Sequence, residues 1–328
     1  MRIANERTQS ESPSAPAPFP PFYGGDTSCV EVETADGEII LFDLGTGVRA
    51  CSHHLLGRIA DKTDRTVHVF GSHQHIDHRM GTSFASFCFA RPNPFSVHVY
   101  GNHEFLQSLE ERYGLFSHHV TSSMHRDDPI DVDMMSADFQ GVQLVPGNKS
   151  EPVGRANLPG VRTHFGPVRI GSAQVTPFEV YHGPTPCLGY KLTRNGASFV
   201  YCTDHEQRHG DASDPRQVES ELREAELVRQ CKGVDLAYFD GQYLLDEYLG
   251  LRGIGESPPL SRVDWGHSCI EDVVARAREC QIRQTLIGHH DPARTWAQLW
   301  EIDRSLAAPG GGGSNTVRLA RSGLVFDL

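Results

Sequence analysis

The chain has 328 residues, with 30 lysines and arginines against 42 aspartates and glutamates, so its formal net charge is −12 at pH 7. This acidic balance disfavours general binding to nucleic acid, because carboxylates and backbone phosphates repel each other. No window approaches 18 consecutive apolar residues, and no apolar core of a signal peptide follows the start. We therefore expect no membrane span and a cytoplasmic protein. The eight cysteines are scattered without a C-x-x-C pair and are expected to be reduced thiols.

The first part of the chain predicts a tail, then strands with one helix. Residues 1–20 are rich in serine and proline and are expected to be a disordered tail, with a single domain over 21–328. Strand patterns occur over Cys29–Val32, Glu38–Phe42, Val67–Phe70 and Val97–Tyr100, and a helix is predicted over Glu104–Tyr113. Residues 114–165 are polar with weak periodicity, and we interpret them as an insertion or lid beside the site.

From residue 168 onward, strands come first and then alternate with helices. The predicted strands are Val168–Ile170, Gln174–Val180, Leu188–Leu192, Ser198–Tyr201, Val234–Phe239, Gln284–Ile287, Thr316–Leu319 and Leu324–Phe326. The predicted helices are Glu219–Cys231, Ile270–Cys280 and Thr295–Leu306. Pro177 interrupts one strand pattern, which favours an edge position or a bulge there. The alternation favours a layered α/β fold.

The most informative segment is a run of ionisable residues directly after the apolar stretch Val67–Phe70. It reads H-x-H-x-D-H and contains His73, His75, Asp77 and His78. Imidazole suits zinc and similar divalent ions, and a carboxylate extends the range to harder ions. On an extended segment the first two histidines point to one side, while the last two residues lie past a turn. The spacing therefore indicates two metal ions, one for each pair.

Two metals need more ligands, and further candidates follow predicted strands. His182 follows the strand that ends near Val180, and Asp204 ends the strand pattern that begins at Ser198. A carboxylate at the end of an apolar strand is costly to bury unless it is paired or bound to a metal. His289 and His290 both follow the strand over Gln284–Ile287, and periodicity alone does not decide which one is the ligand.

Together these motifs resemble a known family. They comprise Asp43, then His73-Gln74-His75-Ile76-Asp77-His78, Tyr181-His182-Gly183, Tyr201-Cys202-Thr203-Asp204 and Gly288-His289-His290-Asp291-Pro292, with Asp240-Gly241-Gln242-Tyr243 and Trp265-Gly266-His267-Ser268 as additional segments. The chain resembles the metallo-β-lactamase superfamily from about Gly24 to its C-terminus. Within that superfamily it is similar to the branch that includes ribonuclease Z and the cyclic phosphodiesterases.

The resemblance implies an α/β fold, a four-layer αβ/βα sandwich, with a binuclear metal site. It implies one metal held by His73, His75 and His182, a second held by Asp77, His78 and His289, and Asp204 bridging both. Asp43 is expected to support the ligands by hydrogen bonds rather than to bind metal. Asp240 and Ser268 are expected to support them in the same way. The ligands suit zinc, and manganese or iron would fit the same donors.

The resemblance also implies a mechanism for cleaving a small or cyclic phosphodiester. A hydroxide that bridges the two metals would attack phosphorus, so Asp77 and Asp204 are catalytic through the metals that they hold. His267 is the candidate donor of the proton that the leaving alkoxide needs. An alternative interpretation is that His267 and Ser268 merely begin the helix after them, with Ser268 as its N-cap.

Other functions remain open at this point. The same binuclear site could hydrolyse a thioester, a lactone or a lactam, and a third possibility is a metal-binding sensor without catalysis. The segment around His267 favours the phosphodiesterase. A tRNA substrate is disfavoured by the charge and by the lack of a basic, glycine-rich arm like that of ribonuclease Z. We expect a small-molecule substrate and no membrane partner, and the sequence leaves a homodimer open.

Overall fold

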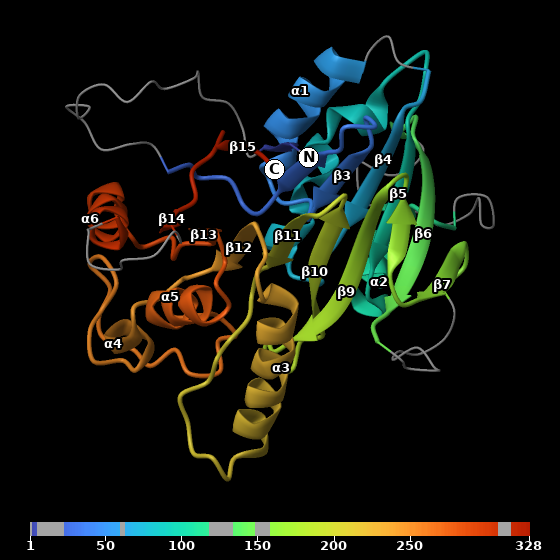
Figure 1. Cartoon of the computed structure of the whole chain (residues 1–328). Helices are drawn as coiled ribbons and strands as arrows, with labels where there is room; N and C mark the ends of the chain where they lie inside the picture. The colour runs from blue at the N-terminus through green and yellow to red at the C-terminus, as the bar shows by residue number, and fades with distance from the viewer. Residues whose placement is uncertain (1, 5–22, 60–62, 118–133, 148–157, 308–315) are drawn as a thin grey trace, which may run out of the picture. The chain divides into compact units, whose positions relative to one another are not determined.

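The computed structural model describes residues 2–4, 23–59, 63–117, 134–147, 158–307 and 316–328. These residues form two compact units, and Figure 1 labels most of their helices and strands. Unit 1 consists mainly of Asp26–Pro177, together with the short strands near the two chain ends. Unit 2 consists mainly of Phe178–Leu324. Each unit is described below by itself.

Unit 1 contains a sheet of eight strands in the order β15-β1-β2-β3-β4-β5-β6-β7. The strands are β1 (Arg2–Ala4), β2 (Val30–Glu33), β3 (Ile39–Phe42), β4 (Thr66–Phe70), β5 (Ser96–Gly101), β6 (Asp138–Val145), β7 (Val161–Phe165) and β15 (Val325–Asp327). From β3 to β7 neighbouring strands are parallel, whereas β1 pairs antiparallel with both β2 and β15. The helices are α1 (Val48–Ile59) and α2 (His103–Tyr113), with 3₁₀ turns η1 (Ile76–His78), η2 (Met80–Phe84) and η3 (Ser86–Phe89).

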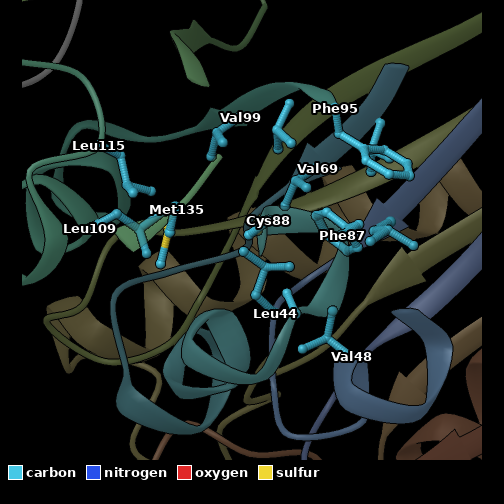
Figure 2. Packing of buried hydrophobic residues seen from close by; sticks show 14 of the residues in the cluster. Leu44, Val48, Val69, Phe87, Cys88, Phe95, Val99, Leu109, Leu115 and Met135 are labelled. Atoms are coloured by element: carbon cyan, nitrogen blue, oxygen red, sulfur yellow. The ribbon is translucent and has the colours of Figure 1, made fainter. Parts of the chain in front are cut away.

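The helices of unit 1 cover one face of this sheet. Alternate residues of β4 and β5, such as Val69 and Val99, pack in one apolar cluster with Val48 of α1 and Leu109 of α2. Figure 2 shows these side chains pointing toward one another, with Phe87 of η3 among them. Since successive side chains of a strand point to opposite faces, this cluster fixes which residues face the helices.

Unit 2 contains the later strands and four helices. The strands are β9 (Ala173–Val180), β10 (Cys187–Arg194), β11 (Ala197–Cys202), β12 (Leu236–Asp240), β13 (Gln284–Gly288) and β14 (Thr316–Leu319), and the helices are α3 (Pro215–Cys231), α4 (Leu245–Tyr248), α5 (Ile270–Glu279) and α6 (Trp296–Leu306). The pairs β11–β12, β12–β13 and β13–β14 are parallel. The boundary between the units falls inside β9, whose first residues pair in unit 1 with β8 (Val168–Ile170).

The helices of unit 2 also cover one face of their sheet. Val200, Ala237 and Ile287 from neighbouring strands share an apolar cluster with Leu227 of α3 and Val273 of α5. Each unit therefore supplies a sheet with helices on one face, and both α/β layer pairs of the expected four-layer sandwich are present.

Most predicted elements agree with the structure, and a few differ. The segment 114–165, interpreted as an insertion or lid, contains β6 and β7, which are integral strands of the sheet of unit 1; residues 118–133 and 148–157 lie outside the described residues. Arg2–Ala4 form β1 within the segment expected to be a tail, and 5–22 lie outside the description. Helices α1 and α4 lie outside the predicted elements.

Three further expectations concern a proline, the cysteines and membrane spans. β8 pairs with residues up to Val175 of β9 and stops before Pro177, so the missing N–H of this proline removes no hydrogen bond to β8. All eight cysteines are free and buried, as predicted for reduced thiols. Within the described part of the chain, no helix is both long and apolar enough to cross a membrane.

A buried ion pair joins two helices of unit 2. Nε and an Nη atom of Arg276 on α5 each donate to one oxygen of Glu224 on α3, both at 2.7 Å. Burial acts to raise the pKa of Glu224, but Arg276 and His205 outweigh burial and hold this pKa well below its usual value. The guanidinium also lies over the Phe239 ring, 5.2 Å from its centroid. This pair connects the helical layer to β12.

Replacing Glu224 by Gln should lower the free energy of unfolding by about 3 kcal/mol near pH 7, because Arg276 would keep a buried charge without a carboxylate. A carboxyl group whose pKa is lowered on folding stabilises the protein above its unfolded pKa of about 4.5, and that contribution disappears as the pH falls further. In urea unfolding of the metal-free proteins, the difference in free energy of unfolding between wild type and Glu224→Gln should therefore become smaller below pH 4.5. Glu219→Gln, exposed on the same helix, should change stability by less than about 0.5 kcal/mol at either pH.

Candidate metal centre

In unit 1, Asp43 organises the histidine run. Asp43 follows β3 with a left-handed backbone (φ 60°) and is fully buried. Its carboxylate accepts the backbone N–H of Ser72 at 2.6 Å and the Ser72 hydroxyl at 2.7 Å. It also lies 2.8 Å from Nδ1 of His78. A carboxylate that accepts several hydrogen bonds holds the loop after β4 in one conformation, as expected of Asp43 from the sequence.

These hydrogen bonds fix the proton positions on two imidazole rings. A carboxylate only accepts, so Nδ1 of His78 must carry the proton that points to Asp43. The Ser72 hydroxyl donates to Asp43, so at 3.0 Å from Nδ1 of His73 its oxygen can accept the Nδ1 proton of that ring. In their neutral forms both rings then carry their lone pair on Nε2, the tautomer that a metal ion requires.

The remaining members of the run gather around His73. Its ring lies 4.5 Å from that of His75 and 4.3 Å from that of His78, measured between centroids. Nε2 of His78 lies 3.2 Å from a carboxylate oxygen of Asp77. His73 and His78 are buried, whereas His75 is exposed and Asp77 is partly exposed. Unit 1 therefore brings three imidazoles and one carboxylate into one loop.

In unit 2, three neighbouring parallel strands deliver polar residues to one edge of the sheet. Asp204 follows β11, Asp240 is the last residue of β12, and His289 follows β13. Parallel strands place their carboxyl ends at the same edge, where α/β proteins commonly bind ligands. Asp204 and His289 both have left-handed backbones, with φ of 55° and 52°. Such strain in non-glycine residues costs about 1–3 kcal/mol each and is concentrated at functional sites.

The Asp204 carboxylate is surrounded by imidazoles. It is 1% exposed, and its oxygens lie 3.4 Å from Nε2 of His289 and 3.7 Å from Nε2 of His182. Nδ1 of His267 is 3.9 Å away. The donor atoms of Asp204, His267 and His289 all lie within 4.8 Å of one another. A buried carboxylate ringed by imidazole nitrogens suits a divalent cation, so the residues present fit the metal that the sequence predicts.

His182 is held by the loop that carries His267. Nδ1 of His182 lies 2.8 Å from the carbonyl oxygen of Gly266. A carbonyl only accepts, so Nδ1 carries the proton and Nε2 of the neutral ring carries the lone pair. Gly266 has φ 86°, and a Cβ atom there would lie 2.0 Å from Nδ1 of His182. Only glycine can therefore bring its carbonyl this close to the ring.

His289, rather than His290, faces the Asp204 carboxylate. Nδ1 of His289 lies 3.1 Å from the side-chain amide of Gln242, a group that can present either its nitrogen or its oxygen to the ring. Burial lowers the pKa of His290 to about 4, so this ring is neutral near pH 7.

His267 lies between Asp204 and Asp240. Its Nδ1 is 3.5 Å from an Asp240 oxygen, and its ring stacks on that of His289 with centroids 5.0 Å apart. Burial raises the pKa of Asp240, but the nearby His267 imidazole more than offsets burial and lowers it. Ser268 donates its backbone N–H to Asp240 at 2.7 Å. Asp240 and Ser268 thus support the position of His267.

The alternative role of Ser268 as a helix cap is wrong. The N-cap of α5 is Cys269, and no side-chain hydrogen bond caps this helix. The Ser268 hydroxyl instead donates to the backbone carbonyl of His205 at 2.5 Å. The serine therefore fastens the His267 loop to the chain after β11.

Sequence reasoning missed two residues that directly follow Asp204. His205 is fully buried, accepts the backbone N–H of Tyr181 at Nδ1 and lies 2.8 Å from Glu224 at Nε2. Glu206, also fully buried, accepts the backbone N–H groups of Asp264 and Gly266 at 2.9 and 2.8 Å. The sequence does contain a signal for these residues. Asp204, His205 and Glu206 are three successive ionisable residues that follow an apolar strand, and the run that begins at His73 also follows one.

Comparisons with known proteins identify the family of the chain. A family model described as a β-lactamase superfamily domain matches residues 38–290. The chain belongs to the metallo-β-lactamase superfamily. Because this superfamily consists of metal-dependent hydrolases, the protein is a hydrolase of the metallo-β-lactamase fold. The match spans residues of both units.

Several solved structures share the fold. Unliganded yeast PDE1 is 13% identical, with a TM-score of 0.58, and the match covers 100% of this chain and 99% of that one. The metallo-β-lactamase fold protein YhfI from Bacillus subtilis is 14% identical, with a TM-score of 0.55 and 99% of each chain covered. Human tRNase Z, short form, is 16% identical, with a TM-score of 0.52 and coverages of 100% and 99%. No curated protein matches the sequence.

Asp43→Asn should weaken divalent metal binding by about 10- to 100-fold, because an amide has one acceptor oxygen, so its NH2 group would face either the Ser72 N–H or the pair formed by the Ser72 hydroxyl and Nδ1 of His78. The affinity is measured by competition with a chromophoric chelator at pH 7. Asp138→Asn, an exposed change in the same unit, is the control and should leave the affinity unchanged. Equal affinities for the two variants would contradict a supporting role for Asp43.

Proposed function

We propose that the protein is a metal-dependent phosphodiesterase that hydrolyses a small or cyclic phosphodiester. In this proposal His73, His75 and His182 would hold one divalent cation, Asp77, His78 and His289 would hold another, and Asp204 would serve both. Support comes from the superfamily match and from the lone pairs that Asp43 and Gly266 direct to Nε2 of the ligand rings. When bound, divalent cations supply an activated water nucleophile and neutralise the charge that develops on the phosphoryl oxygens.

The residues of unit 2 provide what phosphodiester cleavage needs besides the nucleophile. The bond from phosphorus to the leaving oxygen breaks, and the leaving alkoxide must be protonated. The carboxylates in the cluster are poor proton donors, because they are ionised when they hold a cation. Nδ1 of His267 faces Asp240, so Nε2 is the atom that this ring presents to the substrate. Protonated His267 would deliver the Nε2 proton while Asp240 stabilises the imidazolium.

The observation that carries the proposal is the position of His267 beside the Asp204 and His289 cluster, outside the proposed ligand set. Because the proposed ligand set does not use His267, its imidazole is available to move a proton. We further propose that the metal is zinc, because the donors are rich in histidine. We also propose that the substrate is a small molecule rather than a nucleic acid, and that the protein is cytoplasmic.

The proposal predicts hydrolysis of bis(p-nitrophenyl) phosphate by the metal-loaded protein. Asp204→Ala should abolish turnover and release metal. His267→Ala should retain its metal and lose about 10²- to 10⁴-fold in kcat, as expected when a general acid is removed. The loss should be larger for methyl phenyl phosphate than for methyl p-nitrophenyl phosphate, because the more basic leaving group depends more on protonation. His53→Ala, an exposed change on α1, is the matched control.

Two results would count against this function. Wild-type protein that holds metal but cleaves only lactam, lactone or thioester substrates would show that the site acts on another bond. An equal loss in His267→Ala for the two methyl esters would exclude proton donation by this residue. Metal binding without any hydrolysis would favour a sensor.

A further inference from the structure

A second group of metal-binding side chains lies in unit 2, outside the set discussed above. His209 follows Arg208 in the loop before α3, Cys269 is the N-cap of α5, and Asp272 lies in the first turn of α5. Their donor atoms all lie within 4.8 Å of one another. Nε2 of His209 is 2.8 Å from an oxygen of Asp272. One imidazole, one thiol and one carboxylate therefore converge from two separate segments.

The thiol of Cys269 is an unexplained member of this group. The residue is 1% exposed, and among the described residues its sulfur has no hydrogen-bond partner. One side of this thiol packs in a small buried cluster with Tyr243, Tyr248 and Ile254. The thiol also lies near the negative charges of Asp272, Glu271 and Asp240. Such surroundings disfavour an unbound thiolate and favour a cation beside the sulfur.

We propose that His209, Cys269 and Asp272 form a third, mononuclear site for a thiophilic divalent cation of the zinc class. Nε2, Sγ and a carboxylate oxygen would supply three ligands, and water would supply the fourth, since the His209 side chain is 33% exposed. In a tetrahedral zinc site, bonds of roughly 2.0–2.3 Å place the ligand atoms roughly 3.2–3.7 Å apart. The three donor atoms here lie within 4.8 Å of one another, so small side-chain shifts would bring them to this spacing. Binding would replace the His209–Asp272 hydrogen bond and release the thiol proton together with any proton on the ring that the ion displaces.

The site would act on the segment that carries His267. Cys269 comes two residues after His267, and Ser268 between them is bonded to Asp240. A cation that ties Cys269 to His209 would fasten the end of this segment to the loop before α3. The proposal does not depend on the hydrolytic reaction, because none of its three ligands belongs to the proposed hydrolytic metal sites.

Cobalt(II) substitution separates this site from the hydrolytic one. A Co(II)–thiolate bond gives a near-ultraviolet charge-transfer band, and the proposed hydrolytic ligands include no cysteine. Titration of the metal-free full chain with Co(II) should give this band and a third equivalent of bound metal. Cys269→Ser and His209→Ala should each lose the third equivalent, and Cys269→Ser should also lose the band. Cys280→Ser, another buried cysteine near α5, should keep both.

The outcomes distinguish this proposal from the phosphodiesterase. Saturation at two equivalents without a thiolate band, or a band that persists in Cys269→Ser, would overturn the third site. If Cys269→Ser fails to fold, His209→Ala on the exposed loop decides alone. His209→Ala should retain hydrolysis at two equivalents of metal. Failure of phosphodiester hydrolysis in the wild type, with the thiolate band present, would leave the third site standing.

Discussion

The buried carboxylate of Asp204 is the constraint from which the organisation of unit 2 follows. A carboxylate that is 1% exposed would be costly without cations or hydrogen bonds around it. Parallel strands β11, β12 and β13 end at the same edge of the sheet, which brings His289 to 3.4 Å from this carboxylate. The left-handed backbone at both residues redirects the chain as it leaves each strand. The sheet thus pairs a strained, negatively charged position with nitrogen donors, and the Thr203 hydroxyl donates to the same carboxylate at 2.6 Å.

A second layer of charged groups holds these donors in place. Glu206 accepts backbone N–H groups from the loop that precedes His267, and the Tyr248 hydroxyl donates to the same carboxylate at 2.5 Å. His205 connects the chain after β11 to Glu224, which in turn pairs with Arg276. Residues of α3 and α5 therefore help to hold the chain after β11, which carries Asp204, in place. This explains why the segment 204–206 is entirely buried although each of its residues is ionisable.

The fold class predicted from the sequence is confirmed, whereas the site residues stay predictions. The run from His73 to His78 stands out because ionisable residues follow an apolar strand directly, and Asp204 and His289 obey the same rule. His289 is preferred over His290 because it comes first after the strand, but periodicity does not encode the backbone turn of φ 52° at this residue. β6 was missed because only its second half is buried, so its exposed start masks the strand pattern. The roles of Ser268 and Glu206 depend on contacts between distant segments, which a linear reading does not contain.

The carbonyl of Gly266 holds the His182 ring against the loop that carries His267, and this limits which substitutions the loop can accept. No side chain fits at position 266 without displacing the His182 ring, and the positive φ independently excludes most residues. Trp265, directly before it, is 51% exposed, so the space around this side chain admits other residues. In this loop, a position that is open to substitution therefore lies directly beside one that requires glycine.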